Sequence, residues 1–442
     1  MAVAIAVGTA FALAAATAHG AGGKLDYRSC VEDTGPPGEC ARQAAGLGSP
    51  SDLVVSPDGR DVYVTGYADD AIVQLKRNRR TGALRVGPCI EDPEGPGTCE
   101  ATVNGLDGAI ELAISDDGRH VYTIAYLDST LLHFKRNRQT GALTFAHCVD
   151  DAGLAPVDDV CADTEAAANG LQGPQGLALS PDGRSLYVAS QLDDAVVRFK
   201  LNRAGKPLER GCFEDDDKFV ADDCTRDPEG LGNAQAVVVA PNGRSLYVAA
   251  SDDDAVTRFK RAPRSGALAY RGCVDNRTPA GPDDCARSAE GLREAYSIGI
   301  SPDGRYLYTG TINDGSMAQF RLGNAGQLRP RGCIEAPFSS AQCATVAQGI
   351  GRAADFAFDS AGRSLYVVGG VAIQPFKRFP GSGELIEQAC IEDDDRAPSG
   401  TSCTREAEGL GGTYAVAMSP DDDWLYTASQ TDSTIGVFSR GR

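Results

Sequence analysis

The sequence predicts an all-β fold, a seven-bladed β-propeller with four antiparallel strands in each blade. A unit of about 60 residues recurs seven times along the 442-residue chain, and each copy carries one closely spaced pair of cysteines. Each copy also contains a tight turn of the Ser-Pro-Asp-Gly-Arg type, which is complete at residues 56–60, 180–184 and 301–305. Repeats of short, hairpin-linked strands without helical periodicity are typical of propeller blades.

Each repeat is expected to supply its strands in a fixed order. A Gly-Leu or Gly-Ile step precedes a first apolar strand, such as residues 177–179, and the Ser-Pro-Asp-Gly turn follows. In that turn proline presets φ, aspartate bonds its own backbone and glycine supplies a positive φ. The second strand carries a tyrosine that we expect to pack between blades. An Asp-rich turn, a third strand and a Thr-Gly turn then lead to the fourth strand. The seven tyrosines are Tyr63, Tyr122, Tyr187, Tyr247, Tyr308, Tyr366 and Tyr426.

The two ends of the chain predict a closed ring. The last repeat stops after its third strand, residues 434–439, whereas residues 23–30 match the fourth strand of the first repeat, residues 82–89. An N-terminal strand that completes the seventh blade removes the open sheet edge that a linear array would expose. We therefore expect residues 19–442 to form a single propeller domain.

The fourteen cysteines indicate an oxidising compartment. They fall into seven pairs separated by 10 to 13 positions, and we expect one local disulfide in each blade. Zinc is the alternative, but it would require a second cysteine pair or nearby histidines in each repeat, and the chain has only four histidines. The expected pairs are Cys30 with Cys40, Cys89 with Cys99, Cys148 with Cys161, Cys212 with Cys224, Cys273 with Cys285, Cys333 with Cys343 and Cys390 with Cys403.

Residues 1–18 are expected to be a signal peptide, so the protein is expected to be secreted or extracytoplasmic. A small apolar run, residues 2–16, leads into Ala16-Thr17-Ala18, which fits the small-x-small cleavage pattern. No Lys or Arg precedes Lys24, so the usual basic segment is missing, and a buried N-terminal strand is the alternative. No other run approaches the roughly 20 apolar residues of a transmembrane helix.

The charge balance restricts the class of partner. A formal net charge of −19 and a pI near 4.7 argue against nucleic acid and against an anionic membrane surface, because both require clustered Lys and Arg. A cationic ligand, a divalent cation such as Ca²⁺ or simple solubility fits this charge better. We expect a monomer that binds an unknown small molecule or a cell-envelope or protein ligand.

Three recurring segments carry a resemblance to a known family. They are the Ser-Pro-Asp-Gly-Arg turn with its following strand (residues 180–188), the Asp-rich turn into a Phe-Lys-Arg strand (253–261) and Thr-Gly-Ala-Leu (140–143). In these segments the chain resembles the YVTN-type and lactonase-type seven-bladed propellers, which include bacterial 6-phosphogluconolactonase and carboxymuconate-cyclising enzymes. The resemblance covers nearly the whole chain after residue 18. It implies the fold more specifically than the activity, since the paired cysteines depart from the cytosolic lactonases.

Acidic residues gather in two recurring loops. A carboxylate stands two residues after the first cysteine of every pair, often followed by Asp, and it is expected either to bind Ca²⁺ or to be a solvated polar loop residue. The turn between the second and third strands usually carries Asp, which is expected either to join a ring of ligands or to bond nearby backbone amides. The loop carboxylates are Glu32, Glu91, Asp150, Glu214, Asp275, Glu335 and Glu392, with Asp33, Asp92, Asp151, Asp215 and Asp393 after them. The turn residues are Asp69, Asp128, Asp193, Asp253, Asp314 and Asp432.

The mouth of the central channel is the predicted functional site, because its residues vary between otherwise similar repeats. Asp52, Glu111 and Asp355 come from blades one, two and six, and blade seven lies between six and one in a closed ring. Three carboxylates converging there could act as acid and base or bind a metal ion. The alternative is a water-filled rim. The expected binding residues around them are Gln175, Gln235, Tyr296, Arg352 and Tyr414.

Two functions follow as hypotheses. The first is an extracellular binding or scaffolding module, for which dependence on a cation is one option. The second is a lactonase-like hydrolase that acts on a small lactone at the channel mouth. No nucleophile elbow, phosphate loop or zinc-protease motif is present in the sequence. His120, His133 and His147 fall on three strands of one blade, away from the channel, and are expected to pack there. Blade six, which lacks the turn Asp, is the irregular copy.

Overall fold

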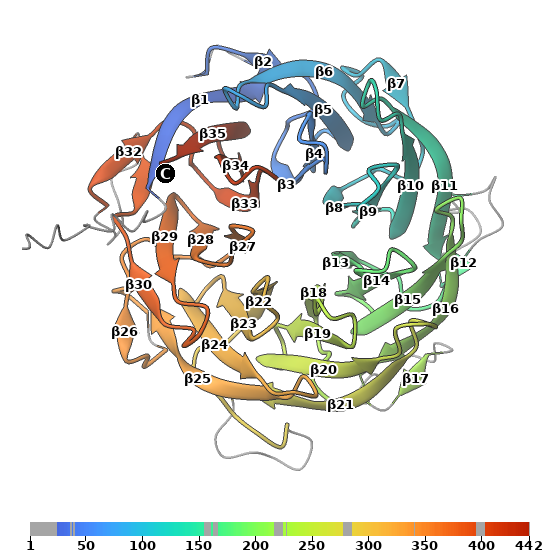
Figure 1. Cartoon of the computed structure of the whole chain (residues 1–442). Helices are drawn as coiled ribbons and strands as arrows, with labels where there is room; N and C mark the ends of the chain where they lie inside the picture. The colour runs from blue at the N-terminus through green and yellow to red at the C-terminus, as the bar shows by residue number, and fades with distance from the viewer. Residues whose placement is uncertain are drawn as a thin grey trace, which may run out of the picture.

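A ring of seven β-sheets surrounds a central channel in the computed structural model (Figure 1). The structure describes residues 24–35, 38, 40–153, 161, 167–215, 224–226, 228–276, 285–339, 341–394 and 403–441. The predicted seven-bladed propeller is confirmed. The expected signal peptide, residues 1–18, lies outside the described residues. In the part of the chain that is described, no helix is long and apolar enough to cross a membrane.

Blades one to four follow one another around the ring. Blade one is β3 (Pro50–Val55), β4 (Asp61–Gly66), β5 (Ala71–Arg77), β6 (Leu84–Glu91) and β7 (Ala101–Thr102). Blade two is β8 (Ala109–Ile114), β9 (His120–Ala125), β10 (Thr130–Arg136), β11 (Leu143–Asp151) and β12 (Ala167–Ala168). Blade three is β13 (Pro174–Leu179), β14 (Ser185–Ser190), β15 (Ala195–Leu201), β16 (Pro207–Glu214) and β17 (Thr225–Arg226). Blade four is β18 (Ala234–Val239), β19 (Ser245–Ala250), β20 (Ala255–Arg261) and β21 (Leu268–Asp275).

Blades five to seven complete the ring. Blade five is β22 (Ala295–Ile300), β23 (Tyr306–Thr311), β24 (Ser316–Leu322), β25 (Leu328–Glu335) and β26 (Thr345–Val346). Blade six is β27 (Asp355–Phe358), β28 (Ser364–Gly369), β29 (Ala372–Arg378), β30 (Leu385–Glu387), β31 (Ile391–Asp393) and β32 (Arg405–Ala407). Blade seven is β33 (Thr413–Met418), β34 (Trp424–Ser429), β35 (Thr434–Arg440), β1 (Leu25–Asp33) and β2 (Gln43–Ala44).

The N-terminal strand closes the ring as the sequence predicts. β1 pairs antiparallel with β35, with Leu25 opposite Arg440 and Val31 opposite Ile435. Figure 1 shows the blue β1 along the red β35 at the seam. Closure of the seventh blade by this strand pairs the outer side of β35, which would otherwise be an open sheet edge.

A fifth outer strand was not predicted from the sequence. In six blades a strand of two or three residues pairs parallel with the end of the fourth strand, as Ile90 pairs with Ala101 in blade one. In blade four the same place holds a single bridge between Asp275 and Ser288. A strand this short contains too few residues to show an alternating pattern, which is why sequence reasoning missed it.

The hydrophobic core lies between neighbouring blades. Blades seven and one share a cluster in which Val64 and Leu75 meet Tyr426 and Ile435. All six residues of β4 are buried, since this second strand is covered by a blade on each side. The seven tyrosines are buried between blades as expected, and the hydroxyl of Tyr122 donates to the carbonyl of Gly205 in the next blade at 2.8 Å. Tight inter-blade burial is the main source of stability in such a ring.

Disulfides link the fourth strand of every blade to the loop that follows it. All seven predicted pairs form, and no cysteine of the chain is free. The two Cα atoms of each pair are 4.9 to 5.5 Å apart, within the ordinary range for a disulfide. The zinc alternative is therefore wrong. The bonds join Cys30 to Cys40, Cys89 to Cys99, Cys148 to Cys161, Cys212 to Cys224, Cys273 to Cys285, Cys333 to Cys343 and Cys390 to Cys403.

Candidate functional site

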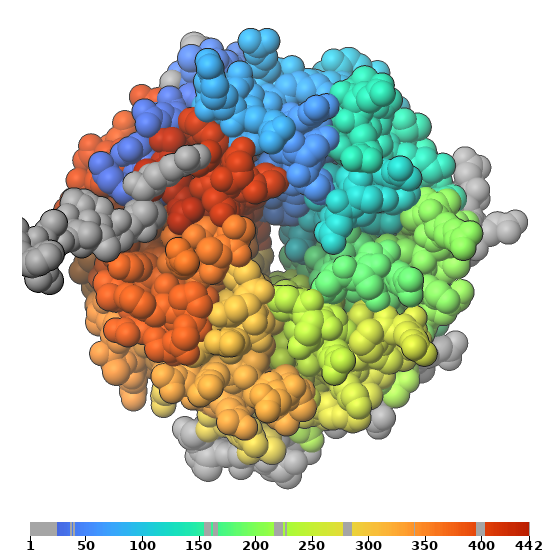
Figure 2. All heavy atoms as spheres, in the orientation of Figure 1, coloured from blue at the N-terminus to red at the C-terminus, as the bar shows by residue number. Residues whose placement is uncertain are grey.

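A small cavity of about 110 Å³ lies in the central channel, and nearly all the predicted site residues line it. Figure 2 shows the narrow opening at the centre of the ring. Arg352 is exposed and lies outside this lining, and its backbone packs against Gly369 of blade six. The lining includes the three predicted acids and four of the five predicted binding residues; these are Asp52, Glu111, Asp355, Gln175, Gln235, Tyr296 and Tyr414.

The innermost strand of each blade positions the acids. Asp52 lies on β3, Glu111 on β8 and Asp355 at the start of β27, so each carboxylate reaches the channel from a different blade. Each one also accepts a backbone N–H from the next blade, which fixes its orientation. Oδ2 of Asp52 accepts from Leu112 at 2.7 Å, and Oδ2 of Asp355 accepts from Val416 at 2.9 Å. Glu111 accepts from the backbone of Leu177 in the same way.

The three acids perturb one another. Burial raises the pKa of Asp52 to about 6. Burial and the charge of Asp52 raise the pKa of Asp355 to about 7. Burial, together with the charges of both aspartates, raises the pKa of Glu111 well above its usual value. Carboxylates that share a poorly solvated space cannot all ionise at neutral pH, so this group retains at least one proton there.

Aromatic and amide groups complete the cavity wall. The rings of Tyr296 and Tyr414 meet edge to face, with their centroids 6.0 Å apart. Burial and the charge of Glu111 raise the pKa of Tyr296, so its phenol remains a hydrogen-bond donor at neutral pH. Nε2 of Gln235 donates to Oγ of Ser251 at 3.2 Å, whereas its buried Oε1 has no partner among the described residues. A ligand with a donor group could supply that missing hydrogen bond.

The cavity wall carries no compensating positive charge. Within the described residues, no Lys, Arg or His lines it. A phosphate or carboxylate ligand would therefore meet three acids without a cation to pair with, which is electrostatically unfavourable. An uncharged or cationic ligand would be favoured.

The residues that the structure describes contain no group of three or more His, Cys, Asp or Glu side chains placed to hold a metal ion. Asp52, Glu111 and Asp355 are among those residues. What these three carboxyl groups share is a raised pKa, so each keeps its proton to a higher pH than a solvated carboxyl group does.

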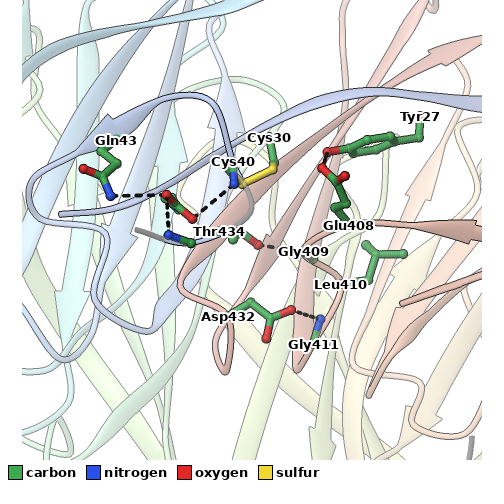
Figure 3. Close-up of a disulfide and its surroundings, with 12 residues drawn as sticks. Tyr27, Cys30, Cys40, Gln43, Glu408, Gly409, Leu410, Gly411, Asp432 and Thr434 are labelled. Carbon is green, nitrogen blue, oxygen red and sulfur yellow. Dashed lines mark hydrogen bonds between the residues drawn. A yellow bond between two sulfur atoms is a disulfide. The ribbon is translucent and has the colours of Figure 1, made fainter. Parts of the chain in front are cut away.

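Most of the loop carboxylates beside the cysteines are buried, and for them the expectation of a solvated loop residue is wrong. Glu32 is only 7% exposed, and its Oε2 accepts from the backbone of Cys40 at 3.2 Å. The disulfide between Cys30 and Cys40 closes the loop that contains Glu32 (Figure 3). The following carboxylate accepts from the Gly-Leu step, as Asp92 does from Leu106 at 3.1 Å. Backbone amides thus replace water around these carboxylates.

Asp69, Asp128, Asp193, Asp253 and Asp432 of the second turns bond backbone amides, which is one of the two roles expected for the turn aspartates. Oδ2 of Asp69 accepts from Gly48 at 2.8 Å, and Oδ2 of Asp432 accepts from Gly411 at 2.5 Å (Figure 3). Blade six replaces this turn with a bend of two residues, Gly370 and Val371, between β28 and β29. The same bond to a backbone amide recurs at Asp128, Asp193 and Asp253.

The disulfides bear on where the protein is found. Seven of them, one in each blade, are typical of an oxidising, extracytoplasmic environment. Each one closes a short loop on the outer side of the ring, as the disulfide between Cys30 and Cys40 does at the seam, so none belongs to the channel cavity.

The three histidines of blade two lie side by side away from the channel, as expected. Nδ1 of His120 is 2.9 Å from Nε2 of His133, and the ring of His133 stacks on that of His147. None of the three lines the cavity that holds the acids.

These features define a disulfide-linked seven-bladed propeller with an acidic channel site. The family model described as "Lactonase, 7-bladed beta-propeller" matches residues 112–275. The chain is a distant homologue of that family and is similar to 6-phosphogluconolactonases. It is 24% identical to that of Enterobacter sp. (strain 638) over 240 residues, 47% of this chain and 67% of the relative. It is also 24% identical to that of Erwinia tasmaniensis over 323 residues, 72% of this chain and 76% of the relative.

Solved structures share the fold at low sequence identity. A putative 6-phosphogluconolactonase from Bacteroides uniformis is 20% identical to this chain, with a TM-score of 0.55. The match covers 80% of this chain and 86% of that protein. Hydrazine synthase of Kuenenia stuttgartiensis is 12% identical to this chain, with a TM-score of 0.53. The match covers 90% of this chain and 97% of that protein. Proteins with such different names share this fold, so the function must be argued from the site.

Proposed function

We propose that this protein is an extracytoplasmic propeller that binds a small uncharged or cationic polar molecule, or the end group of a larger one, in its central channel. One observation carries the proposal: three carboxyl groups from blades six, one and two line one cavity, and all three have raised pKa values. Perturbed titratable groups that converge in a concave site are typical of functional sites.

The size and chemistry of the cavity define the ligand further. A volume of about 110 Å³ is below the several hundred Å³ typical of pockets for drug-sized ligands, so the cavity suits a small molecule or the end group of a larger one. Protonated carboxyls and the Tyr296 phenol donate hydrogen bonds, whereas the ionised carboxyls and Oε1 of Gln235 accept them. This mixture suits hydroxyl, carbonyl and ammonium groups. It disfavours the phosphate of the substrate that the names of the relatives imply.

Calorimetric titration with defined probes tests the binding proposal. Glucono-1,5-lactone, δ-valerolactone and ethanolamine serve as uncharged and cationic probes, and 6-phosphogluconate serves as the anionic one. We expect at least one of the first three to bind more tightly than 6-phosphogluconate. The double variant Glu111→Gln, Asp355→Asn should weaken that binding at least tenfold, whereas Arg352→Gln, outside the cavity, should leave it unchanged. Preference for the phosphorylated probe, or no binding by any probe, would contradict the proposal.

Lactone hydrolysis is the second candidate, and the pKa of Asp355 favours it. A carboxyl with a pKa of about 7 is matched to general-base catalysis at neutral pH, and the more strongly shifted Glu111 remains an acid. In this scheme a water oxygen attacks the lactone carbonyl carbon, and Asp355 takes a proton from that water molecule. Glu111 donates a hydrogen bond to the carbonyl oxygen. The ring C–O bond then breaks, and the proton held by Asp355 goes to the leaving alkoxide, which yields a hydroxy acid.

A rate measurement separates catalysis from binding alone. Hydrolysis of δ-valerolactone to 5-hydroxypentanoate would be followed by acid release for the native protein and for the double variant Asp52→Asn, Asp355→Asn. We expect the double variant to lose at least a hundredfold in kcat/KM if the acids perform the reaction. Equal rates in the two proteins would remove these residues from the mechanism and leave binding as the function of the cavity.

A further inference from the structure

A guanidinium latch recurs at four blade interfaces, at the opposite end of the strands from the channel acids. In each latch an arginine at the end of a third strand binds the tyrosine hydroxyl of the preceding blade, a glycine carbonyl of its own first turn and an aspartate in the first turn of the preceding blade. In blade two, Arg136 makes these bonds to Tyr63, Gly118 and Asp58 at 2.7, 3.0 and 3.1 Å. The latch arginines are Arg77, Arg136, Arg261 and Arg378.

Two interfaces carry leucine where the latch has arginine. Leu322 of blade five faces the first turn of blade four, in which Asn242 replaces the latch aspartate. This interface therefore lacks both the arginine and the aspartate of a latch. Leu201 of blade three has no such match, because the first turn of blade two retains Asp117. The interface between blades two and three therefore keeps the acceptors of a latch without its guanidinium.

An open cleft of about 820 Å³ marks this place, and its lining includes Asp117, Tyr122, Gly183 and Leu201. The Asp117 side chain is 54% exposed, whereas the aspartates of the four latches that contain an arginine, the filled latches, are 24% to 32% exposed. Apart from its chain neighbours, no atom lies within 4 Å of the position that a Cβ on Gly183 would take. At the equivalent Gly59, Nη1 of the latch arginine lies 3.0 Å from that position. The space that a guanidinium fills elsewhere is empty here.

We propose that this cleft binds a guanidinium ligand, which takes the place of the missing latch arginine. Three acceptors are arranged for it as in the filled latches: the Tyr122 hydroxyl oxygen, the Gly183 carbonyl and the Asp117 carboxylate. Tyr122 donates its own proton to Gly205 at 2.8 Å, so its oxygen remains free to accept. Three of the four latch tyrosines, Tyr63, Tyr187 and Tyr426, donate to the equivalent glycine in the same way. Burial lowers the pKa of the neighbouring His120, which therefore adds no opposing charge at neutral pH.

The rim of the cleft indicates that the ligand also carries a carboxylate. Five exposed cations line it in a protein whose net charge is −19. Within the described part of the chain, none of them forms an ion pair with a carboxylate. Free arginine, or the C-terminal arginine of a peptide, combines a guanidinium with a carboxylate in one small ligand. The rim cations are Arg184, Lys200, Arg203, Arg210 and Arg264.

Titration with three related compounds tests the proposal. Arginine carries both groups, agmatine lacks the carboxylate and citrulline lacks the charged guanidinium. We expect calorimetry to show the highest affinity for arginine, a lower affinity for agmatine and the lowest for citrulline, which should bind at least tenfold more weakly than arginine. A peptide that ends in arginine, compared with its C-terminal amide, distinguishes a peptide ligand from the free amino acid. Citrulline binding as tightly as arginine, or absence of arginine binding, would overturn the proposal.

Two variants locate the site. Leu201→Arg should fill the cleft with its own guanidinium, abolish arginine binding and raise the melting temperature. Leu322→Arg, which faces Asn242, is the matched control and should leave arginine binding unchanged. Asp117→Asn should weaken binding by about fivefold, the scale of one exposed ion pair. Because Asp117 is a surface residue, this variant tests the site even where Leu201→Arg does not fold. Unaltered binding in both Leu201→Arg and Asp117→Asn would place the ligand elsewhere.

Discussion

Nε of Arg136 in blade two donates a 2.7 Å hydrogen bond to the hydroxyl of Tyr63 in blade one. The same guanidinium bonds the Gly118 carbonyl and the carboxylates of Asp58 and Asp61. Both Arg136 and Asp61 are buried, so a single side chain satisfies polar groups of two blades in a space that water scarcely reaches. The blades of this ring are thus joined by buried ion pairs at their edges as well as by apolar packing.

Removal of that guanidinium should destabilise the ring strongly. In Arg136→Leu the buried carboxylate of Asp61 loses its 2.5 Å partner but keeps Lys76 at 3.1 Å. The Tyr63 hydroxyl and the Gly118 carbonyl lose a buried donor as well, so the change should cost about 2–4 kcal/mol. The free energy of unfolding from urea denaturation measures the effect. Arg119→Leu is the control, because Arg119 is exposed and lies 3.9 Å from Asp117, so it should change stability by less than about 1 kcal/mol. Equal losses in the two variants would contradict a structural role for the latch.

Gly82 should not tolerate a side chain. It has φ of +66°, and a Cβ there would lie 2.0 Å from the indole ring of Trp424 in blade seven. We expect Gly82→Ala to cost more than about 2 kcal/mol, since it combines backbone strain with a clash. Gly272→Ala is the matched control, because Gly272 has φ of +91° and, apart from its chain neighbours, no atom within 4 Å of its Cβ position. It should show the backbone cost of about 1 kcal/mol alone.

Fluorescence provides a second measurement for the same pair of variants. Trp424 is the only tryptophan of the chain, so its emission reports on the seam between blades seven and one. Gly82→Ala should shift that emission, whereas Gly272→Ala, in blade four, should not. An unshifted emission together with an unchanged free energy of unfolding in Gly82→Ala would show that the seam can accommodate the added carbon.

The repeat explains why so much of the site could be predicted. A given position in each copy occupies the same place in each blade, so Asp52, Glu111 and Asp355 had to meet once the ring closed. Arg352 was predicted with them but lies outside the cavity lining, because it precedes β27 in a loop segment whose direction no strand period fixes. The raised pKa values could not be predicted, since they depend on how closely three blades approach one another.

Hydrogen-bond partners were harder to predict than residue positions. The acidic loops were visible in the sequence, but their acceptor role was not, because the amides that Glu91 and Asp92 bind lie in a segment with no regular pattern. Three of the four latch arginines stood in a visible Phe-Lys-Arg motif, and Arg77 stood in the similar Leu-Lys-Arg. Their acceptors come from two blades, and Arg136 and Tyr63 are 73 positions apart in sequence, so only the folded ring reveals them.

Loss of one disulfide should cost a definite amount of stability. Cys89 and Cys99 close a loop with a sequence separation of 10, for which the loop-entropy model gives about 2–3 kcal/mol. The double variant Cys89→Ser, Cys99→Ser should therefore unfold at lower urea concentration while keeping its strand content by circular dichroism. Thiol titration of the unreduced native protein should find no free cysteine. Titration of several thiols in that protein would contradict both the disulfides and an oxidising location.

The channel acids should make the protein less stable as the pH rises. The folded protein holds a proton on Asp355 up to a pH of about 7, whereas the unfolded chain releases it near the usual value of 3.8. Between pH 3.8 and 7 the folded state therefore binds more protons than the unfolded chain. The stability that the Asp355 proton contributes is fully present below about pH 4 and is lost as the pH rises through 7. Asp52 and Glu111 act in the same direction.

The variant Asp355→Asn removes one of these titrations. It should lose less stability than the native protein between pH 5 and pH 8, by about 1.4 kcal/mol, which is roughly half the full linkage value for the two pH units between 5 and the folded pKa of about 7, because channel water screens the charge. Urea denaturation across that pH range measures the difference. Asp116→Asn, which removes an exposed carboxylate from the first turn of blade two, should follow the native curve. If Asp355→Asn also follows the native curve, the channel acids do not hold their protons at neutral pH, and neither function proposed for the cavity can rest on them.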